Sequence, residues 1–512
     1  MEQKTNMSLD SIEWLSRFLA ETPGDRQKGG LPRQVKGACW SRVDPTPVPS
    51  PTLRLWSEEV ANDLGIQRGG GDVLSGNRIL KGMDPYAQRY GGHQFGNWAG
   101  QLGDGRAITL GEADAGGQVL EVQLKGSGLT PYSRFADGKA VLRSSIREFL
   151  CSEAMFHLGV PTTRALSLVT TGEEVIRDVM YDGRPAPEHG AVVCRVAQSF
   201  LRFGSFQIHA ANGDYKTLRD LVVFTVRHHF PDHSVDDDDG RLGWLKEVAE
   251  ATATMVSHWM RVGFVHGVMN TDNMSIHGLT IDYGPYGWVE DYDPNWTPNT
   301  TDSNTKRYTF GNQGGIAEWN LARLLEAIGP LMDDPNRLYE VLDHFRSKLK
   351  GAMGAMWRQK LGLGAPESDD QNLISDLRSI LRMAETDMTI FFRLLSSIPD
   401  PSQSHLEYAY YEPVEMPRGA LDSWLARWWS RVDGSPDRGG MRLANPKYVL
   451  RNWMSQLAID AAEEGDYSVA NELHGLMKRP YQEQPESEGR WFSKRPEWAR
   501  NRVGCSMLSC SS

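Results

Sequence analysis

The segment HGVMNTDNMSIHGLTIDYGPYG, which runs from His266 to Gly287, constrains the fold of this chain more than any other feature. In this segment Asn273 is followed by the apolar run GLTI and then by Asp282. An amide oxygen and a carboxylate oxygen are hard donors, and together with phosphate oxygens and water they suit Mg²⁺. The segment therefore predicts a metal-binding loop that serves a phosphorylated ligand.

The same segment resembles the catalytic centre of protein kinases. The run from His266 to Asn273 aligns without gaps with the kinase pattern H-R-D-L-x-x-x-N, whose asparagine binds Mg²⁺. Asp282, followed by Tyr and Gly, then matches the D-F-G aspartate that holds a metal ion on the phosphates. Val268 stands where kinases have their catalytic aspartate, and a valine cannot take a proton. The pattern thus retains the metal ligands and lacks the base.

Asp272 is the candidate for the missing base, because it stands next to the metal-binding Asn273. It can serve only if the hydroxyl substrate approaches from a direction different from that of a kinase substrate. The alternative is a loop acid that caps a turn, since short motifs of Asp and Asn recur by chance.

Two parts of the chain differ in their patterns, and this predicts an α+β protein. The runs AITLGE and VLEVQLK, joined by DAGGQ, predict a β-hairpin, and VLRSSIREFLCSEAMFHLG predicts a helix. From residue 214 onward apolar residues recur mostly at helical spacing, whereas DDDDG at 236–240 is expected to be a solvated loop. We expect four units: an N-terminal extension packed on the core (1–80), a β-rich nucleotide-binding lobe (81–210), a larger helical lobe with the metal-binding loop (211–490) and a flexible cysteine-containing tail (491–512).

Charge and hydropathy exclude some classes of partner. The 512 residues carry a net charge of −11, whereas a protein that binds duplex nucleic acid normally has a basic face. No window approaches the ~18 consecutive apolar residues of a membrane span. The N-terminus carries Glu2, Asp10 and Glu13, unlike a secretory signal or a transit peptide, so we expect a cytoplasmic protein.

Further candidates for a phosphate site precede the opening segment. Lys125 ends the strand-like run LEVQLK, and Glu148 lies in the next predicted helix, as in the lysine–glutamate pair of kinases. Gly103 and Gly105 allow close backbone approach to an anion, and Arg106 adds charge. Strand-end lysines, surface glutamates and glycine turns are all common. The interpretation as a kinase-like phosphate site therefore depends on the order of these residues along the chain.

Two arginines, Arg195 and Arg202, lie in CRVAQSFLRFG, a region where kinases need no such pair. Arginine binds phosphate in bidentate fashion. From spacing alone, surface salt bridges are the commoner explanation. Asp137 and Gly138 could contact a nucleotide, or could simply make a turn.

The five cysteines are Cys39, Cys151, Cys194, Cys505 and Cys510, and they form neither a disulfide framework nor a CxxC zinc pattern. Cys505 and Cys510 lie in the polar ending GCSMLSCSS, where we expect exposed thiols. They are either a redox pair or accidental thiols of a frayed end.

Taken together, these segments resemble the selenoprotein O family, which is also known by the bacterial name YdiU. The resemblance rests on long runs: GGHQFGNWAGQLGDGR, LKGSGLTPYSRFADGKAVLRSSIREFLCSEAM, LGVPTTRALSLV, HGVMNTDNMS, LTIDYGP and NPKYVLRNW. It implies a protein-kinase-like fold of two lobes with additional N- and C-terminal segments, and ATP held in a flipped orientation. The implied activity is the transfer of AMP from ATP to Ser, Thr or Tyr hydroxyls of proteins.

The resemblance also implies a role for each candidate. Asp272 is the proton acceptor, Asn273 and Asp282 bind Mg²⁺ or Mn²⁺, and Glu148 pairs with Lys125. The implied nucleotide contacts are Gly103, Gly105, Arg106, Lys125, Asp137, Gly138, Arg195 and Arg202. Cys510 takes the place of the selenocysteine that some members carry third from the end, with Cys505 as its implied redox partner. Eukaryotic members are mitochondrial, whereas the acidic N-terminus here favours a bacterial, cytoplasmic one.

Three other functions remain open at this point. The same residues could transfer UMP from UTP, because base selectivity depends on the shape of the pocket. A nucleotide-binding pseudokinase scaffold without catalysis would explain Val268, but it need not keep both metal ligands. A kinase that uses Asp272 as its base is disfavoured by Arg195 and Arg202.

Overall fold

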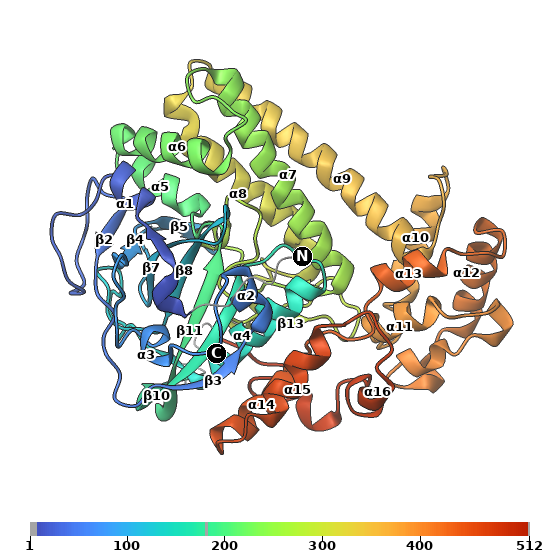
Figure 1. Cartoon of the computed structure of the whole chain (residues 1–512). Coiled ribbons are helices and arrows are strands. Elements are labelled where there is room, and N and C mark those ends of the chain that lie inside the picture. Colours follow the sequence, from blue (N-terminus) through green and yellow to red (C-terminus); the bar gives the residue numbers. More distant parts are fainter. Residues whose placement is uncertain (1–7, 180–182, 510–512) are drawn as a thin grey trace.

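The computed structural model describes residues 8–179 and 183–509, and it confirms the expected mixture of sheet and helices (Figure 1). Among these residues the N-terminal part builds a nine-stranded antiparallel sheet, and most of the sixteen α-helices follow it in the chain. No helix of the described part is long and apolar enough to cross a membrane.

The large sheet has the strand order β2-β4-β7-β8-β11-β10-β3, with β1 added to β7 and β9 added to β11. Two short hairpins, β5–β6 and β12–β13, lie outside it. The strands of the large sheet are β1 (Glu13–Leu15), β2 (Trp40–Arg42), β3 (Thr52–Trp56), β4 (Tyr86–Gln88), β7 (Ala107–Asp114), β8 (Val119–Lys125), β9 (Ala140–Val141), β10 (Arg164–Arg177) and β11 (Ala186–Ala197). Those of the hairpins are β5 (Gly91–Gln94), β6 (Asn97–Gln101), β12 (Phe264–Val265) and β13 (Gly287–Trp288).

The predicted hairpin is the β7–β8 pair, and its alternation creates the two faces of the sheet. Leu120, Val122 and Leu124 of β8 belong to an apolar cluster with the helices of residues 58–74. Because successive side chains of a strand point to opposite faces, Gln123 and Lys125 lie on the other face. One face of the sheet is therefore sealed by an apolar core, and the other is free to carry a polar site.

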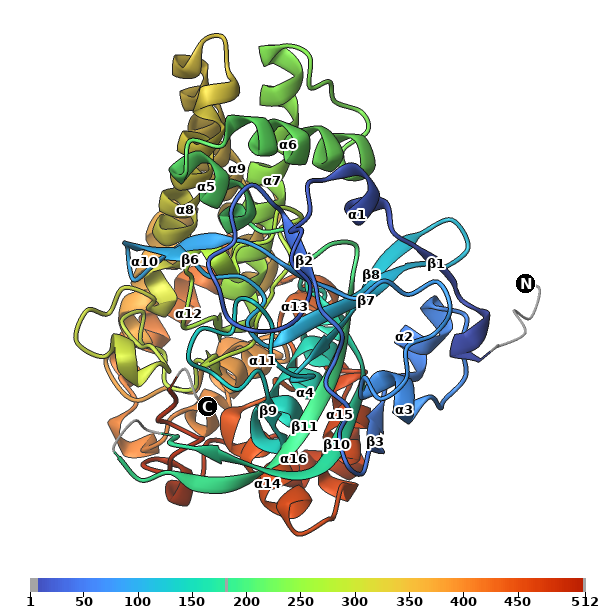
Figure 2. The same ribbon diagram turned by 90° about the vertical axis from the view of Figure 1, so that its left-hand side faces the viewer.

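The N-terminal segment packs on the outer edge and outer face of this sheet (Figure 2). Strand β1 pairs with β7, and Arg17 forms an ion pair of 2.8 Å with the buried Glu112 of β7. The short helices are α1 (Arg17–Glu21), α2 (Glu58–Asp63) and α3 (Gly71–Leu74). Helix α4 (Leu142–His157), predicted from sequence, packs against β10 and β11 and brings Glu148 toward the polar face.

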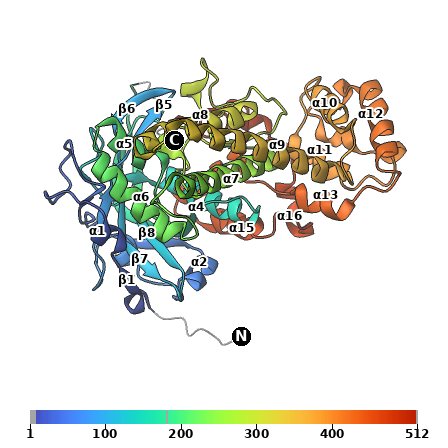
Figure 3. The same ribbon diagram turned by 90° about the horizontal axis from the view of Figure 1, so that it is seen from above.

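The helical part begins with α5 and is dominated by two long helices, α7 and α9, which lie side by side (Figure 3). Its helices are α5 (Phe203–Ala211), α6 (Tyr215–His229), α7 (Asp238–Val262), α8 (Gln313–Ile328) and α9 (Tyr339–Leu361). The expectation of a solvated loop at 236–240 is wrong, because the Asp237 side chain accepts from the Gly240 N–H and caps α7. Acidic residues in a first turn are favoured by the orphan N–H groups and the helix dipole.

The C-terminal helices form two groups. Helices α10 (Asp370–Ile380), α11 (Met388–Leu395), α12 (Arg418–Arg431) and α13 (Arg438–Ala444) surround a second apolar core. Helices α14 (Asn452–Glu463), α15 (Ser468–Met477) and α16 (Pro485–Trp491) belong to the main core, and α14 and α15 contact α4.

The end of the chain differs from the expected loose tail with exposed thiols. Trp491, Ala499 and Leu508 are buried, and Cys505 is only 5% exposed. The Asn452 Nδ2–H also donates to the Cys505 carbonyl oxygen at 2.9 Å. The expectation of an exposed thiol is therefore wrong for Cys505, because this segment completes the main core. Cys510 lies outside the described residues, so the redox pairing stays a prediction.

Candidate active site

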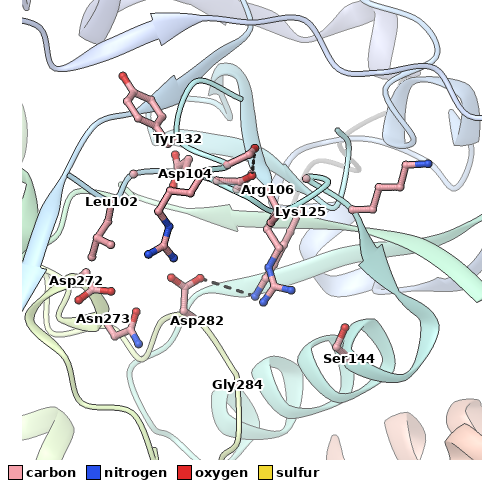
Figure 4. Close-up of a pocket in the computed structure, with 18 of the residues that line it drawn as sticks. Leu102, Asp104, Arg106, Lys125, Tyr132, Ser144, Asp272, Asn273, Asp282 and Gly284 are labelled. Carbon is pink, nitrogen blue, oxygen red and sulfur yellow. Dashed lines mark hydrogen bonds and ion pairs between the residues drawn. The ribbon is translucent and has the colours of Figure 1, made fainter. Parts of the chain in front are cut away.

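A cavity of about 750 Å³ opens between the polar face of the sheet and residues 268–285 (Figure 4). The loop before β7, the loop from Tyr132 to Lys139 and parts of the β5–β6 hairpin, α4 and β10 also line it. The predicted site residues that line it are Gly103, Gly105, Arg106, Lys125, Asp137, Gly138, Arg195, Asp272, Asn273 and Asp282. Arg202 and Glu148 do not line it, but each contacts a residue that does.

Asp282 lies at the centre of a cluster of cations. Its Oδ1 is 2.5 Å from Arg195 Nη1 and 3.9 Å from Lys125 Nζ, and its Oδ2 is 2.6 Å from Arg202 Nη1. Both arginines are almost fully buried, at 2% and 1% exposure. The alternative that they form surface salt bridges is therefore wrong, and the structure brings both of them to the predicted metal-binding aspartate.

Lys125 and Glu148 form the expected ion pair, with 2.5 Å between Nζ and Oε2. The other carboxylate oxygen of Glu148 lies 3.2 Å from Arg195 Nη1, so strand β8, strand β11 and helix α4 meet at this glutamate. Burial lowers the pKa of Lys125, but Glu148 and Asp282 oppose this loss of charge. Glu148 thereby holds two cations beside the cavity.

Three cations face three carboxylates at this inner end of the cavity, and the exposed Arg106 adds a fourth cation at the cavity wall. Asp104, which sequence reasoning did not single out, is buried here and lies 3.9 Å from Arg202 Nη2. The charged side chains are Arg106, Lys125, Arg195 and Arg202 against Asp104, Glu148 and Asp282. Burial also raises the pKa of Asp104 above its ordinary value. An anion such as a polyphosphate is therefore favoured at this end.

Asp282 is held ionised in a strained backbone conformation. Burial opposes its charge, but Arg202, Arg195 and Lys125 outweigh this and hold the pKa of Asp282 well below its usual range. Its φ is +59°, in the left-handed region that is uncommon for any residue other than glycine, although aspartate tolerates it better than most. Such strain persists where the surroundings over-determine a conformation, and here the two arginines fix the direction of the carboxylate.

The residues at the cavity fit a divalent metal ion that is shared with phosphates. Asn273 donates its Nδ2–H to the Val268 carbonyl oxygen at 2.9 Å, which orients its amide group, and Asp282 is ionised as a metal ligand must be. No cluster of three or more His, Cys, Asp or Glu side chains suited to a metal occurs in the described part of the chain. Two oxygen ligands from protein, completed by phosphates and water, suit Mg²⁺.

Asp272 has surroundings opposite to those of Asp282. Its Oδ2 accepts one hydrogen bond from Gln94 Nε2 at 3.3 Å, and its buried Oδ1 accepts none from any residue that the structure describes. Burial raises the pKa of Asp272 to about 6. A carboxylate with a free oxygen and a pKa just below neutrality is suited to accept a proton.

The β5–β6 hairpin covers the loop that carries Asp272. This contact between hairpin and loop was not predicted from the sequence. The His93 N–H donates to Thr271 Oγ1 at 2.7 Å, and the Phe95 N–H donates to Asn270 Oδ1 at 3.2 Å. A Cβ on Gly92 would lie 2.3 Å from Asp272 Oδ1, so only glycine fits there. The glycine pair of GGHQFG was the available signal, but it does not say which loop the backbone approaches.

The predicted glycines have packing reasons of their own. Gly103 has φ +107°, and a Cβ there would lie 2.5 Å from the Tyr132 ring. Gly138 has φ +73°, and its Cβ would lie 2.1 Å from the Gly128 carbonyl oxygen. Asp137 forms an ion pair with Arg177 at 2.8 Å. These residues shape the cavity wall by bringing its two loops close together.

Comparisons with known proteins identify the family of this chain. The sequence model of the family described as "Protein adenylyltransferase SelO" matches residues 33–478. The chain is 54% identical to the "Protein nucleotidyltransferase YdiU" of Xanthomonas campestris pv. campestris (strain 8004), over 98% of this chain and 99% of the relative. Proteins of the same name from Aromatoleum aromaticum and Flavobacterium johnsoniae are 53% and 52% identical, over 99% and 97% of this chain and 100% and 99% of theirs. The chain therefore belongs to the SelO family of protein adenylyltransferases, and it is a nucleotidyltransferase.

Proposed function

We propose that this enzyme transfers AMP from ATP to Ser, Thr or Tyr hydroxyls of proteins and releases pyrophosphate. The observation that carries the proposal is the group of three buried cations, Lys125, Arg195 and Arg202, around Asp282 at the inner end of the cavity. In this proposal the sheet and the helical part act as the two lobes of a kinase-like fold, with ATP turned round relative to a kinase.

The turned orientation follows from the distribution of charge. An uncharged purine gains little from buried guanidinium and ammonium groups, whereas the β- and γ-phosphates gain charge-assisted hydrogen bonds from them. Placing these phosphates at the inner end leaves the α-phosphate near Asn273 and Asp272. Val268 then lies at a position where the reaction needs no base.

Asp272 acts as the base in this mechanism. Its carboxylate accepts the proton of the target hydroxyl while the hydroxyl oxygen forms a bond to the α-phosphorus. The bond from the α-phosphorus to the bridging oxygen of the leaving pyrophosphate breaks, and the negative charge gained there faces Lys125, Arg195 and Arg202. A positioned base contributes about 10²–10⁴-fold to the rate, and preorganised charges usually contribute more than the base does.

The metal and the nucleotide base are finer points of the same proposal. Mg²⁺ or Mn²⁺ held by Asn273 and Asp282 would neutralise phosphate charge when bound. The residues at the inner end contact no base in this orientation, so UTP could serve as a donor of UMP in the same way. Asp282 is the ligand whose ionisation the surrounding cations secure.

The test uses ATP labelled at either the α- or the γ-phosphate, with Mg²⁺ or Mn²⁺, and self-modification of the purified protein as readout. Label from the α-position alone, lost in Asp282→Ala, is the expected result. Label from the γ-position would mean a kinase that has moved its base and would overturn the proposal. Bound ATP without label from either position would indicate a scaffold that has lost its catalysis.

A further inference from the structure

Phe135 is a fully exposed aromatic side chain, at 107% relative exposure, and yet it lines the cavity. Ile176 of β10 lines the same cavity and is 60% exposed. Single exposed apolar residues are normal on protein surfaces. Two of them at the wall of one cavity, otherwise rich in charged groups, require a separate explanation.

The segments that carry these two side chains are fastened to each other. Asp137, two residues after Phe135, forms an ion pair with Arg177, the residue after Ile176, with 2.8 Å between Oδ2 and Nη1. Lys139 Nζ adds an ion pair with Glu173 Oε2 at 2.6 Å. The loop of Phe135 and strand β10 are therefore joined to each other at the wall of the cavity.

The loop of Phe135 is also fastened to the glycine loop on its other side. Thr130 Oγ1 donates to the Asp104 carbonyl oxygen at 2.6 Å, and Ser133 Oγ donates to the Gly105 carbonyl oxygen at 2.5 Å. Phe135 is thus solvent-exposed on a loop whose base is well anchored. A loop that is anchored in this way loses little backbone entropy when a ligand covers it.

We propose that Phe135, assisted by Ile176, forms the nucleobase subsite at the mouth of the cavity, with Phe135 stacking on the base. The inference rests on the proposed function, because the cations at the inner end hold the phosphates there and direct the other end of the nucleotide outward. That other end is a flat aromatic ring, and an exposed phenylalanine is a stacking platform for it.

Stacking of this kind tolerates every base, because each base has a π-face. A purine covers more of the phenyl ring than a pyrimidine does, so Phe135 should favour ATP over UTP. The subsite would therefore set the nucleotide preference that the charged inner end leaves open. Removal of the phenyl ring should therefore reduce the difference between the affinities for ATP and for UTP.

The experiment measures the Kd values of ATP, UTP and inorganic tripolyphosphate for the full-length protein by calorimetry with Mg²⁺. Phe135→Ala should weaken ATP binding about tenfold and narrow the ATP-to-UTP ratio, with tripolyphosphate binding unchanged. Phe135→Tyr should retain wild-type affinity. The matched control is Tyr339→Ala at the start of α9, which removes a 69% exposed aromatic residue outside the cavity wall and should change nothing.

Three results would overturn the inference. Equal losses for ATP and tripolyphosphate would mean that the variant damages the whole cavity. Unchanged ATP binding with slower modification of protein would mean that Phe135 contacts the protein target instead. If Lys125→Ala leaves both ATP and tripolyphosphate binding unchanged, the proposed function fails and the inference with it. That failure is distinguishable, since it involves Lys125 and not Phe135.

Discussion

The loop beneath the β5–β6 hairpin and the cation cluster behind it shift the pKa of the same kind of side chain in opposite directions. Asp272 in the loop has one weak hydrogen bond and a pKa raised to about 6 by burial. Asp282 in the cluster is only partly buried, with 24% of its side chain exposed, and Arg202, Arg195 and Lys125 lower its pKa far below the ordinary value. Two carboxylates of one cavity can therefore take different parts in the reaction because their surroundings differ.

The difference also concerns stability. Asp282 balances buried cations that the carboxylates of Glu148 and Asp104 neutralise only in part, so its charge supports the fold. Asp272 bears a charge at neutral pH that its surroundings hardly compensate, so its charge costs stability and serves only the reaction. Opposite effects of the same substitution at the two positions would be the most direct check of this comparison.

The largest effect is expected for Asp282→Asn. Transfer of α-label should fall by about 10²–10³-fold or more, because the metal ligand and its charge are lost. Stability should fall by up to about 3–5 kcal/mol, since Arg195 and Arg202 lose the carboxylate they share and keep only Glu148 at 3.2 Å and Asp104 at 3.9 Å. Because the pKa of Asp282 is depressed, its stabilising contribution is present above pH 3.8 and is lost as the pH falls below that value.

Denaturant unfolding at neutral pH measures this loss. Asp433→Asn is the matched control, because Asp433 also has a positive φ of 49° but is exposed. That control should leave both stability and transfer unchanged. Wild-type stability in Asp282→Asn would show that the arginines do not depend on this carboxylate.

Asp272→Asn should act in the opposite direction on stability. kcat should fall by about 10²–10⁴-fold with unchanged ATP affinity, because only the proton acceptor is removed. The folded state binds this proton more tightly than the unfolded state, so the stabilising effect of protonated Asp272 is lost as the pH rises through about 6. Asparagine never carries the charge, and at pH 8 the variant should be more stable by up to about 3 kcal/mol.

Thermal melts and ATP titrations of Asp272→Asn separate the two effects. A variant that binds ATP normally, melts higher and turns over slowly confirms the role of a base. An unchanged rate would remove Asp272 from the mechanism. A lower melting temperature at pH 8 would contradict the claim that its charge is poorly compensated.

The sequence predicted the secondary-structure elements around the two aspartates. It did not predict the contacts that residues far away in the chain make with them. The β7–β8 hairpin, helix α4 and the Asn273–Asp282 segment follow from local patterns, because periodicity and turn residues act over short distances. The bond from Gln94 to Asp272 spans 178 positions, and no local pattern indicates it. The burial of Arg202 likewise depends on how α5 meets the loop of Asp272, so spacing alone favoured a surface salt bridge.

The pH dependence of kcat/KM should show the raised pKa of Asp272. The base must be ionised, so the rate should rise with pH and level off above about 6. At pH 5 about one molecule in ten carries the charge, and kcat/KM should be about tenfold below its plateau. Asp272→Asn should lack this acidic limb, whereas a limb retained in that variant would assign it to another group.

The smallest effect is expected for Gln94→Leu, which tests how the hairpin influences the base. Gln94 donates the one hydrogen bond that a side chain of the described residues offers to the Asp272 carboxylate, and it favours the ionised form. Its loss should raise the pKa of Asp272 and move the acidic limb to higher pH, by up to about one unit for a bond of ~1 kcal/mol. kcat/KM should therefore fall several-fold near pH 6 and hardly change at pH 8. A uniform fall at every pH would instead mean that Gln94 positions the loop and does not affect its ionisation. A fall confined to pH values near 6 means that the hairpin adjusts the ionisation of Asp272, whereas a uniform fall means that it only positions the loop.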